Sequence, residues 1–170
     1  MSEAPISSGL SDLKACFEEV GCTEVVTYIQ SGNVVFRSER TKSAQLVSHL
    51  QSALSARFNY QAQLVLLTAK QLAEVVASAP ARFGQKPDQY RYDVLFLQPS
   101  LSSGEAIKQI SAKAGVDTAH AGKGVLYFSR LIARASQSHL SRITRLPVYQ
   151  QLTIRNWNTT TKLLALMEQE

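Results

Sequence analysis

Residues 23–37, TEVVTYIQSGNVVFR, decide the fold class of this 170-residue chain. The two ends of the segment, Thr23–Gln30 and Val34–Arg37, are rich in β-branched and aromatic residues, which favour strands. Between them, Ser31-Gly32-Asn33 supplies residues that tolerate positive φ and therefore fit a tight turn. The segment predicts two antiparallel strands joined in a hairpin.

A helix is expected on either side of this hairpin. Before it, apolar residues recur at helical spacing until Gly21, a residue type that commonly ends helices. After it, a second apolar stripe runs from about Lys42 to Phe58. The next apolar segment, Ala62–Leu67, contains no glycine or proline and is predicted to be a strand.

A boundary between two halves is predicted near residue 80. Thr68-Ala69-Lys70-Gln71 has the form of a capping box and opens a short helix that Pro80 must stop. Residues 80–91 have the only linker-like composition in the chain, with Pro80, Gly84, Pro87 and Asp88. We therefore divide the chain into residues 1–79 and residues 80–170.

The second half repeats the order of elements found in the first. Its predicted elements are a strand over Tyr92–Leu97, a helix beginning at Ser102 or Ser103, a hairpin of Val116–His120 and Val125–Ser129, a short helix over Gln137–Arg145, and a final helix capped by Asn158 or Thr159. Each half contains most of a β-α-β-β-α-β unit, which predicts an α+β fold with antiparallel sheets. The first half lacks an opening strand, because residues 1–8 do not supply a good one.

The composition is that of a globular protein, with 45% hydrophobic and 18% charged residues. No apolar run approaches the roughly 18 to 20 residues of a membrane span. The N-terminus lacks the basic and apolar regions of a signal peptide, and Cys16 and Cys22 are too few for a disulfide scaffold. We expect a cytoplasmic protein with reduced thiols that does not contact membranes.

The net charge of +5 lies in the second half. Residues 1–85 carry seven basic and seven acidic side chains, whereas residues 86–170 carry eleven basic and six acidic ones. No acidic residue occurs between Asp117 and Glu168. A basic excess confined to one half indicates an oriented field that attracts an anionic partner. A solvated basic face without a partner is the alternative.

Sequence motifs of catalysis and cofactor binding are missing. Gly122-Lys123-Gly124 lacks the spacing, the hydroxyl residue and the following helix of a P-loop, and it lacks the third glycine of a dinucleotide fingerprint. No nucleophile elbow occurs, and no histidines or cysteines have metal-ligand spacing. We therefore assign no catalytic residue, no metal site and no cofactor from the sequence.

The basic segment 123–162 is the candidate site. Several of its polar residues lie at or just before a predicted helix N-terminus, where free amides and the helix dipole favour an anion. Trp157 is suited to stacking on a base or sugar; alternatively, it anchors the final helix, with Arg155 paired to a carboxylate such as Asp93. The predicted anion-binding residues are Lys123, Ser138, Arg142, Arg145, Arg155, Asn156, Trp157 and Lys162.

Two motifs resemble a known bacterial family. These are Thr27-Tyr28-Ile29-Gln30-Ser31-Gly32-Asn33-Val34-Val35-Phe36 and, much later, Thr153-Ile154-Arg155-Asn156-Trp157-Asn158-Thr159 with Lys162-Leu163. Together they resemble the family of domain of unknown function 1697. The resemblance implies an α+β protein of two ferredoxin-like halves, here with a final extra helix, but no established activity. Members usually begin with a strand and a glycine-rich loop. Without that strand, an exposed sheet edge is expected to favour self-association.

We therefore expect a non-enzymatic binding module for an anionic ligand, either nucleic acid or a phosphorylated small molecule. Two alternatives remain open from the sequence. The first is a small enzyme acting on a phosphorylated or nucleotide substrate, in which His139 or Asp93 is the acid or base. The second is a structural or interaction protein whose basic face binds no specific small ligand. The fold itself does not separate these functions.

Overall fold

The computed structural model describes residues 10–28, 32–39, 43–58 and 64–169. The chain forms an α+β fold divided into two compact units. The first unit comprises residues 1–66 with 165–170, and the second comprises residues 67–164. This division lies before the sequence-predicted position between residues 79 and 80, so the helix that precedes Pro80 belongs to the second unit.

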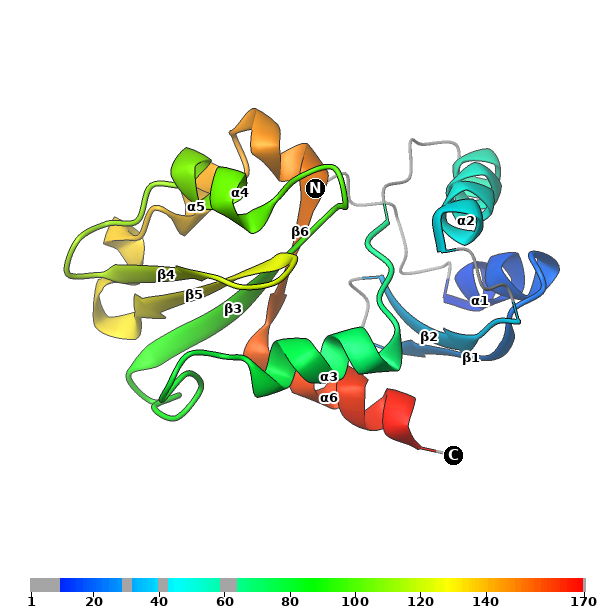
Figure 1. Ribbon diagram of the computed structural model, residues 1–170, viewed down its shortest axis with the longest axis horizontal. Coiled ribbons are helices and arrows are strands. Elements are labelled where there is room, and N and C mark those ends of the chain that lie inside the picture. Colours follow the sequence, from blue (N-terminus) through cyan, green and yellow to red (C-terminus); the bar gives the residue numbers. More distant parts are fainter. Residues whose placement is uncertain (1–9, 29–31, 40–42, 59–63, 170) are drawn as a thin grey trace. The chain divides into compact units, whose positions relative to one another are not determined.

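The first unit includes two helices and the predicted hairpin (Figure 1). Its elements are α1 (Leu10–Glu19), β1 (Thr23–Tyr28), β2 (Asn33–Arg37) and α2 (Ser43–Phe58). The two strands are antiparallel, with Val26 opposite Val35. Gly32 has a φ of 81°, as the predicted turn requires, and the Asn33 amide donates to the Tyr28 carbonyl oxygen across the turn. Ser31 and Ile29–Gln30 of that prediction lie outside the described residues.

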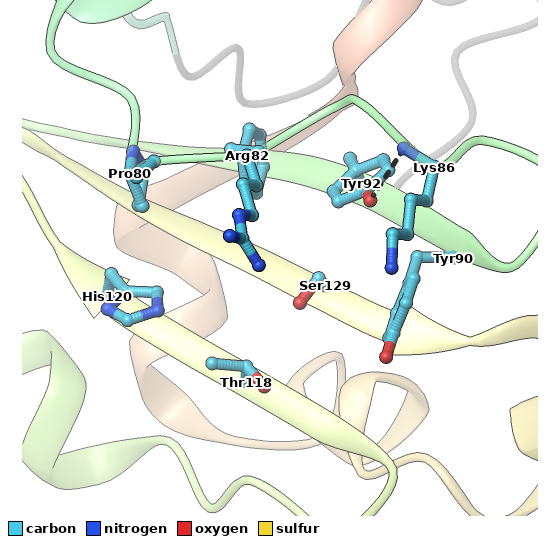
Figure 2. A pocket seen from close by; sticks show the side chains of 10 residues that line it. Pro80, Arg82, Lys86, Tyr90, Tyr92, Thr118, His120 and Ser129 are labelled. Atoms are coloured by element: carbon cyan, nitrogen blue, oxygen red, sulfur yellow. Dashed lines mark hydrogen bonds between the residues drawn. The ribbon is translucent and has the colours of Figure 1, made fainter.

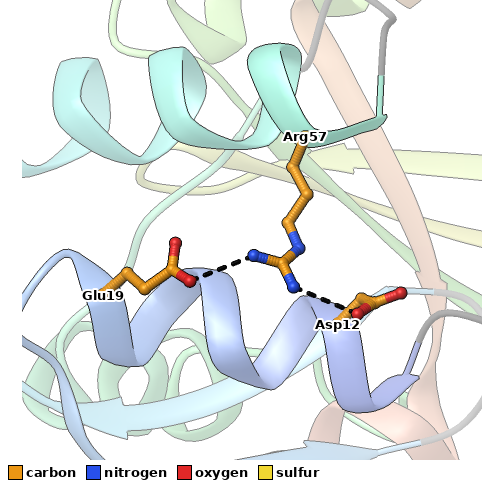
Figure 3. A network of polar contacts seen from close by, with 3 residues as sticks. All are labelled: Asp12, Glu19 and Arg57. Carbon is orange, nitrogen blue, oxygen red and sulfur yellow. Dashed lines mark hydrogen bonds and ion pairs between the residues drawn. The ribbon is translucent and has the colours of Figure 1, made fainter.

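The helices of the first unit pack on one apolar core, which includes Phe17, Leu50 and Leu54. At the surface, Arg57 of α2 links the two helices (Figure 3). Its guanidinium donates to Asp12 and to Glu19, each at 3.1 Å. Because α1 supplies both carboxylates, one side chain connects two turns of that helix to α2.

The strand predicted over Ala62–Leu67 is wrong for the part that the structure describes. Residues 64–67 form no strand there. Leu64 and Leu66 instead pack against the core of the first unit. The apolar character of the segment therefore reflects burial against that core, because no neighbouring strand pairs with these residues.

The second unit contains one four-stranded antiparallel sheet (Figure 1). Its strands are β3 (Tyr90–Leu97), β4 (Asp117–Ala121), β5 (Val125–Leu131) and β6 (Leu152–Asn156), in the order β4-β5-β3-β6. This order and the alternation β3-α4-β4-β5-α5-β6 are those of a ferredoxin-like unit. Strand β6 was not predicted from the sequence, although four of its residues belong to the second family motif.

Helices lie on both faces of this sheet (Figure 1). They are α3 (Ala69–Ala77), α4 (Ser103–Gln109), α5 (Leu140–Ile143) and α6 (Trp157–Glu168), with short 3₁₀ turns η2 (Ile132–Gln137) and η3 (Pro147–Gln151). The predicted capping box is confirmed, since Thr68 and Gln71 exchange hydrogen bonds at the start of α3. The predicted cap of the last helix is wrong: α6 begins at Trp157, and the Asn156 side chain accepts from the Thr159 amide.

The two faces of the sheet have different coverings. Leu95 and Leu97 of β3 point into an apolar core with α4 and α5. Residues of the opposite parity lie on the other face, where the Tyr127 hydroxyl donates to the Val75 carbonyl oxygen of α3. Because side chains alternate along a strand, each strand of the sheet contributes to both environments.

Candidate anion-binding site

A hollow of about 230 Å³ lies on the α3-side face of the sheet. We call it the sheet hollow, and Figure 2 shows its lining side chains. One part of the lining comes from the loop between α3 and β3, residues 80–89. The other part comes from side chains of three neighbouring strands. The lining residues are Pro80, Ala81, Arg82, Phe83, Lys86, Tyr90, Tyr92, Thr118, His120 and Ser129.

The strand residues reach the sheet hollow because their registers align. Tyr92 of β3 lies opposite Ser129 of β5, and Ser129 lies opposite Thr118 of β4. Tyr90 and His120 are each two residues along their strands, so their side chains point to the same face. The antiparallel pairing thus places two tyrosines, two hydroxyl residues and one histidine beside one another.

The 80–89 loop is held over the sheet by Phe83. The Phe83 ring makes edge contacts with Tyr92, Tyr127 and Trp157, at centroid distances of 4.9, 5.5 and 5.0 Å. Gly84 permits this packing, because a Cβ at its position would lie 2.5 Å from Trp157 Nε1. Its φ of 82° also favours glycine. Trp157 therefore anchors the loop as well as beginning α6.

The loop backbone presents two cationic side chains. The Phe83 amide donates to the Pro80 carbonyl at 2.9 Å, and the Lys86 amide donates to the Tyr92 hydroxyl at 3.1 Å. Arg82, between these two contacts, has a φ of 68°, a conformation that is unfavourable for a residue with a side chain. Strained residues of this kind gather at ligand sites when the surrounding packing enforces them.

The electrostatic character of the sheet hollow is positive. Arg82 and Lys86 line it together with the His120 imidazole, and its described lining contains no carboxylate. Within the described residues, neither Arg82 nor Lys86 forms an ion pair. A guanidinium and an ammonium group in one lining without an internal counter-charge favour a phosphate or carboxylate from outside.

Comparison with known proteins gives a family. Residues 8–127 match the family of proteins of unknown function DUF1697. This chain belongs to the DUF1697 family. Its fold is similar to that of a solved structure, the conserved bacterial protein SP0830 from Streptococcus pneumoniae, with a TM-score of 0.80 and 23% identity. That match covers 94% of this chain and 89% of the other. No curated protein matches the chain.

Four of the sequence-predicted site residues in this DUF1697 chain have structural partners. Ser138 is buried, donates to an Asp117 carboxylate oxygen at 2.6 Å and accepts from the Leu140 amide. Asn156 caps α6. Trp157 packs on Phe83. Arg155 of β6 donates to the Thr153 hydroxyl at 2.7 Å and to the Ile154 carbonyl at 2.8 Å.

The sequence left open a pairing of Arg155 with Asp93, and the strand register does not fit that pairing. Asp93 lies opposite Asn156, one residue from Arg155, and so on the other face of the sheet. The cations that act on the Asp93 carboxyl are Arg130 and Arg91. Burial nevertheless raises the pKa of Asp93, and the two arginines only partly oppose that shift. Burial also lowers the pKa of the Arg155 guanidinium.

The other four predicted residues are exposed and lie outside the lining of the sheet hollow. Lys123 is in the turn between β4 and β5, 4.0 Å from a Glu74 carboxylate oxygen, with its side chain 95% exposed. Arg142 is on α5, Arg145 follows it, and Lys162 is on α6. The basic segment is therefore spread over several elements, and the sheet hollow contains none of its eight predicted residues.

Sequence reasoning missed the residues that do line the sheet hollow. A usable signal was present: Tyr90 and Tyr92, and likewise Thr118 and His120, alternate with residues of the other face at the two-residue period of a strand. The segment 80–91 has the composition of a linker, but it also places Arg82 and Lys86 in the loop before β3.

Among the described residues, no helix is long and apolar enough to cross a membrane.

Proposed function

We propose that this protein binds a small anionic ligand, bearing phosphate or carboxylate, in the sheet hollow. The observation that carries the proposal is the charge of the lining, which contains Arg82 and Lys86 and no carboxylate. The proposal keeps the anionic ligand class expected from the sequence. It moves the site from the basic segment 123–162 to the 80–89 loop and the adjoining strands.

The arrangement suits recognition of an anion for two physical reasons. The backbone of the 80–89 loop is fixed by the aromatic contacts of Phe83, so little order has to be gained when a ligand binds. The lining also contains neutral hydrogen-bonding groups, the hydroxyls of Thr118 and Ser129 (Figure 2). Charge then supplies attraction, and the hydroxyls supply direction.

The test compares cations of the sheet hollow with cations elsewhere. Affinity for inorganic phosphate and ribose 5-phosphate is measured by calorimetry in Arg82→Gln and Lys86→Gln, with Arg142→Gln and Lys162→Gln as matched controls. We expect each of the first two changes to weaken binding by about tenfold, the effect of one lost charge-assisted hydrogen bond. The controls should keep the affinity of the unaltered protein.

The opposite pattern would return the site to the basic segment, and no saturable binding of either compound would contradict the proposal. Salt separates the two expected ligand types. A compact phosphate compound in one pocket loses little affinity between low and moderate salt, whereas a nucleic acid held by several phosphate contacts loses much more.

One observation favours a catalytic variant of this function. His120 lines the same hollow as Arg82 and Lys86, and imidazoles are common general acids and bases. In such an enzyme the two cations would stabilise charge on a phosphorylated substrate. His120→Gln should then abolish turnover of that substrate while ligand affinity persists. If the unaltered protein binds the ligand but shows no turnover, the catalytic variant is excluded and the binding function remains.

A further inference from the structure

The lining of the sheet hollow has parts of different chemistry. One part of the lining is aromatic, formed by Tyr90 and Tyr92 of β3, and another part is cationic, formed by Arg82 and Lys86 of the loop (Figure 2). A phosphate alone would contact only the cationic part of the lining. The tyrosine rings suit contact with a second, flat and apolar part of the ligand.

The two tyrosines have different surroundings. Tyr92 is fixed, since its ring meets Phe83 edge-on at 4.9 Å and its hydroxyl accepts from the Lys86 amide. Tyr90 is half-buried. Among the described residues its ring contacts that of Tyr92, at a centroid distance of 6.0 Å and an interplanar angle of 38°. Tyr92 thus supports Tyr90 from one side, and Tyr90 offers ring surface to the sheet hollow.

The spacing between Tyr90 and Lys86 is set by a short stretch of chain. Lys86 and Tyr90 are joined by a short turn, in which the Tyr90 amide donates to the Lys86 carbonyl at 2.9 Å. Lys86 and Tyr90 therefore lie near each other on one side of the sheet hollow, and Figure 2 shows the Lys86 ammonium group above the Tyr90 ring. A ligand that stacks on Tyr90 brings an attached phosphate within reach of the loop cations.

Resting on the proposed function, we propose that the ligand of the sheet hollow is a nucleotide, with its base against Tyr90 and its phosphate at Arg82 and Lys86. The nucleotide is either free or one unit of a single strand. Base-on-aromatic stacking tolerates any base, so the proposal names the class and not the base. By analogy, the ferredoxin-like sheets of RNA-recognition domains stack bases on aromatic side chains of their strands, and β3 is one of the two central strands here.

The experiment uses four probes on the full chain: adenosine 5′-monophosphate, ribose 5-phosphate, adenosine, and a single-stranded hexaadenylate. Affinities are measured by calorimetry at two salt concentrations. We expect adenosine 5′-monophosphate to bind at least about tenfold more tightly than ribose 5-phosphate or adenosine, because only it has both a base for Tyr90 and a phosphate for the loop cations. Equal affinity of the first two compounds would overturn the nucleotide inference while the proposed anion-binding function stands. If none of the four binds, both proposals fail.

Two variants of Tyr90 separate stacking from folding. Tyr90→Phe keeps the ring and should keep the affinity for adenosine 5′-monophosphate, whereas Tyr90→Leu should weaken it by about tenfold without changing the affinity for ribose 5-phosphate. Equal loss of both ligands in Tyr90→Leu would contradict stacking. If Tyr90→Leu does not fold, the comparison of the four probes on the unaltered chain still decides the inference.

The same titrations identify the source of the nucleotide. A hexaadenylate affinity well above that of the monophosphate, with a steep decrease in salt, assigns the sheet hollow to a strand. An affinity no higher than that of the monophosphate assigns it to a free nucleotide. Either result supports the shared chemistry, a base on Tyr90 and a phosphate at the loop cations.

Discussion

The two faces of the four-stranded sheet differ although the same strands build both. On β5, Leu126 and Phe128 are fully buried in the core with α4 and α5. Ser129, the next residue, points to the opposite face and lines the sheet hollow. On β3, Leu95 and Leu97 face the core, whereas Tyr90 and Tyr92 face the hollow. The first face is covered by α4 and α5, whereas the second is buried where α3 packs beside Tyr127 and is partly open at the sheet hollow.

The role of each part of the sheet follows from the elements that pack on it. Helices α4 and α5 bring their own apolar side chains, such as Ala106 and Ile143, and exclude water from the sheet. On the other face, α3 packs beside Tyr127, and the 80–89 loop is held by one aromatic residue, Phe83. Thr118 and His120 are exposed there and Ser129 is half-buried, so these polar side chains remain available to a ligand.

The largest effect expected from this comparison comes from neighbouring residues of β5. Phe128→Ala should lower the free energy of unfolding by about 3–5 kcal/mol, as large cavities in apolar cores do. Ser129→Ala should change it by less than about 0.5 kcal/mol but weaken ligand binding. Chemical denaturation of both variants checks this contrast. Similar destabilisation by the two changes would show that the faces are not distinct.

A smaller effect is expected in the loop. Gly84→Ala should lower the free energy of unfolding by about 2 kcal/mol, because an L-residue is strained at its positive φ and the new methyl group would meet Trp157. Gly104→Ala is the matched control, since Gly104 lies in α4 with open space around it. A slight stabilisation is expected there. Thermal denaturation of the pair suffices, and equal melting temperatures would argue against the close packing of Gly84 on Trp157.

The smallest effect concerns Asp93, on the core face. Burial raises the pKa of its carboxyl, and one carboxylate oxygen has no hydrogen-bond partner among the described residues. The folded state therefore binds the proton more tightly than the unfolded state. This contribution to stability is fully present below the ordinary pKa of aspartate and is lost as the pH rises through the raised value.

Replacing the carboxyl tests that sign. Asp93→Asn should increase the free energy of unfolding at neutral pH by about 1 kcal/mol, the cost of one buried group without a partner. The gain should disappear at acidic pH, where the aspartate is protonated. Denaturation curves of both proteins at several pH values provide the measurement. A variant that is less stable at neutral pH would show that attraction to Arg130 and Arg91 exceeds the cost of burial.

The fold was largely predictable from local sequence signals. The hairpin in residues 23–37, the capping box at Thr68 and the helix-hairpin-helix order shared by both halves each rest on short-range chemistry, and each is present among the described residues. Strand β6 was missed because its residues, LTIRN, mix apolar and polar types in a sheet-edge position. Residues 64–67 show the reverse case, in which an apolar segment is buried without pairing.

The candidate site was harder to predict because it depends on register. Lys86 and His120 are distant in sequence, and only the pairing of β3, β5 and β4 brings their neighbourhoods together. The basic residues of segment 123–162 looked like one surface in sequence, yet Arg142 and Lys162 belong to different helices. Charge content predicted the class of ligand that we propose, but it carried no information on which cations meet.

The packing of Trp157 on the 80–89 loop has a practical consequence. It is the single tryptophan of the chain, and its ring lies 5.0 Å from that of Phe83, within the loop that presents Arg82 and Lys86. Its fluorescence is therefore an intrinsic optical reporter of this loop, with no competing indole signal. Emission wavelength and quenching by iodide can follow the loop in the native protein, without any label.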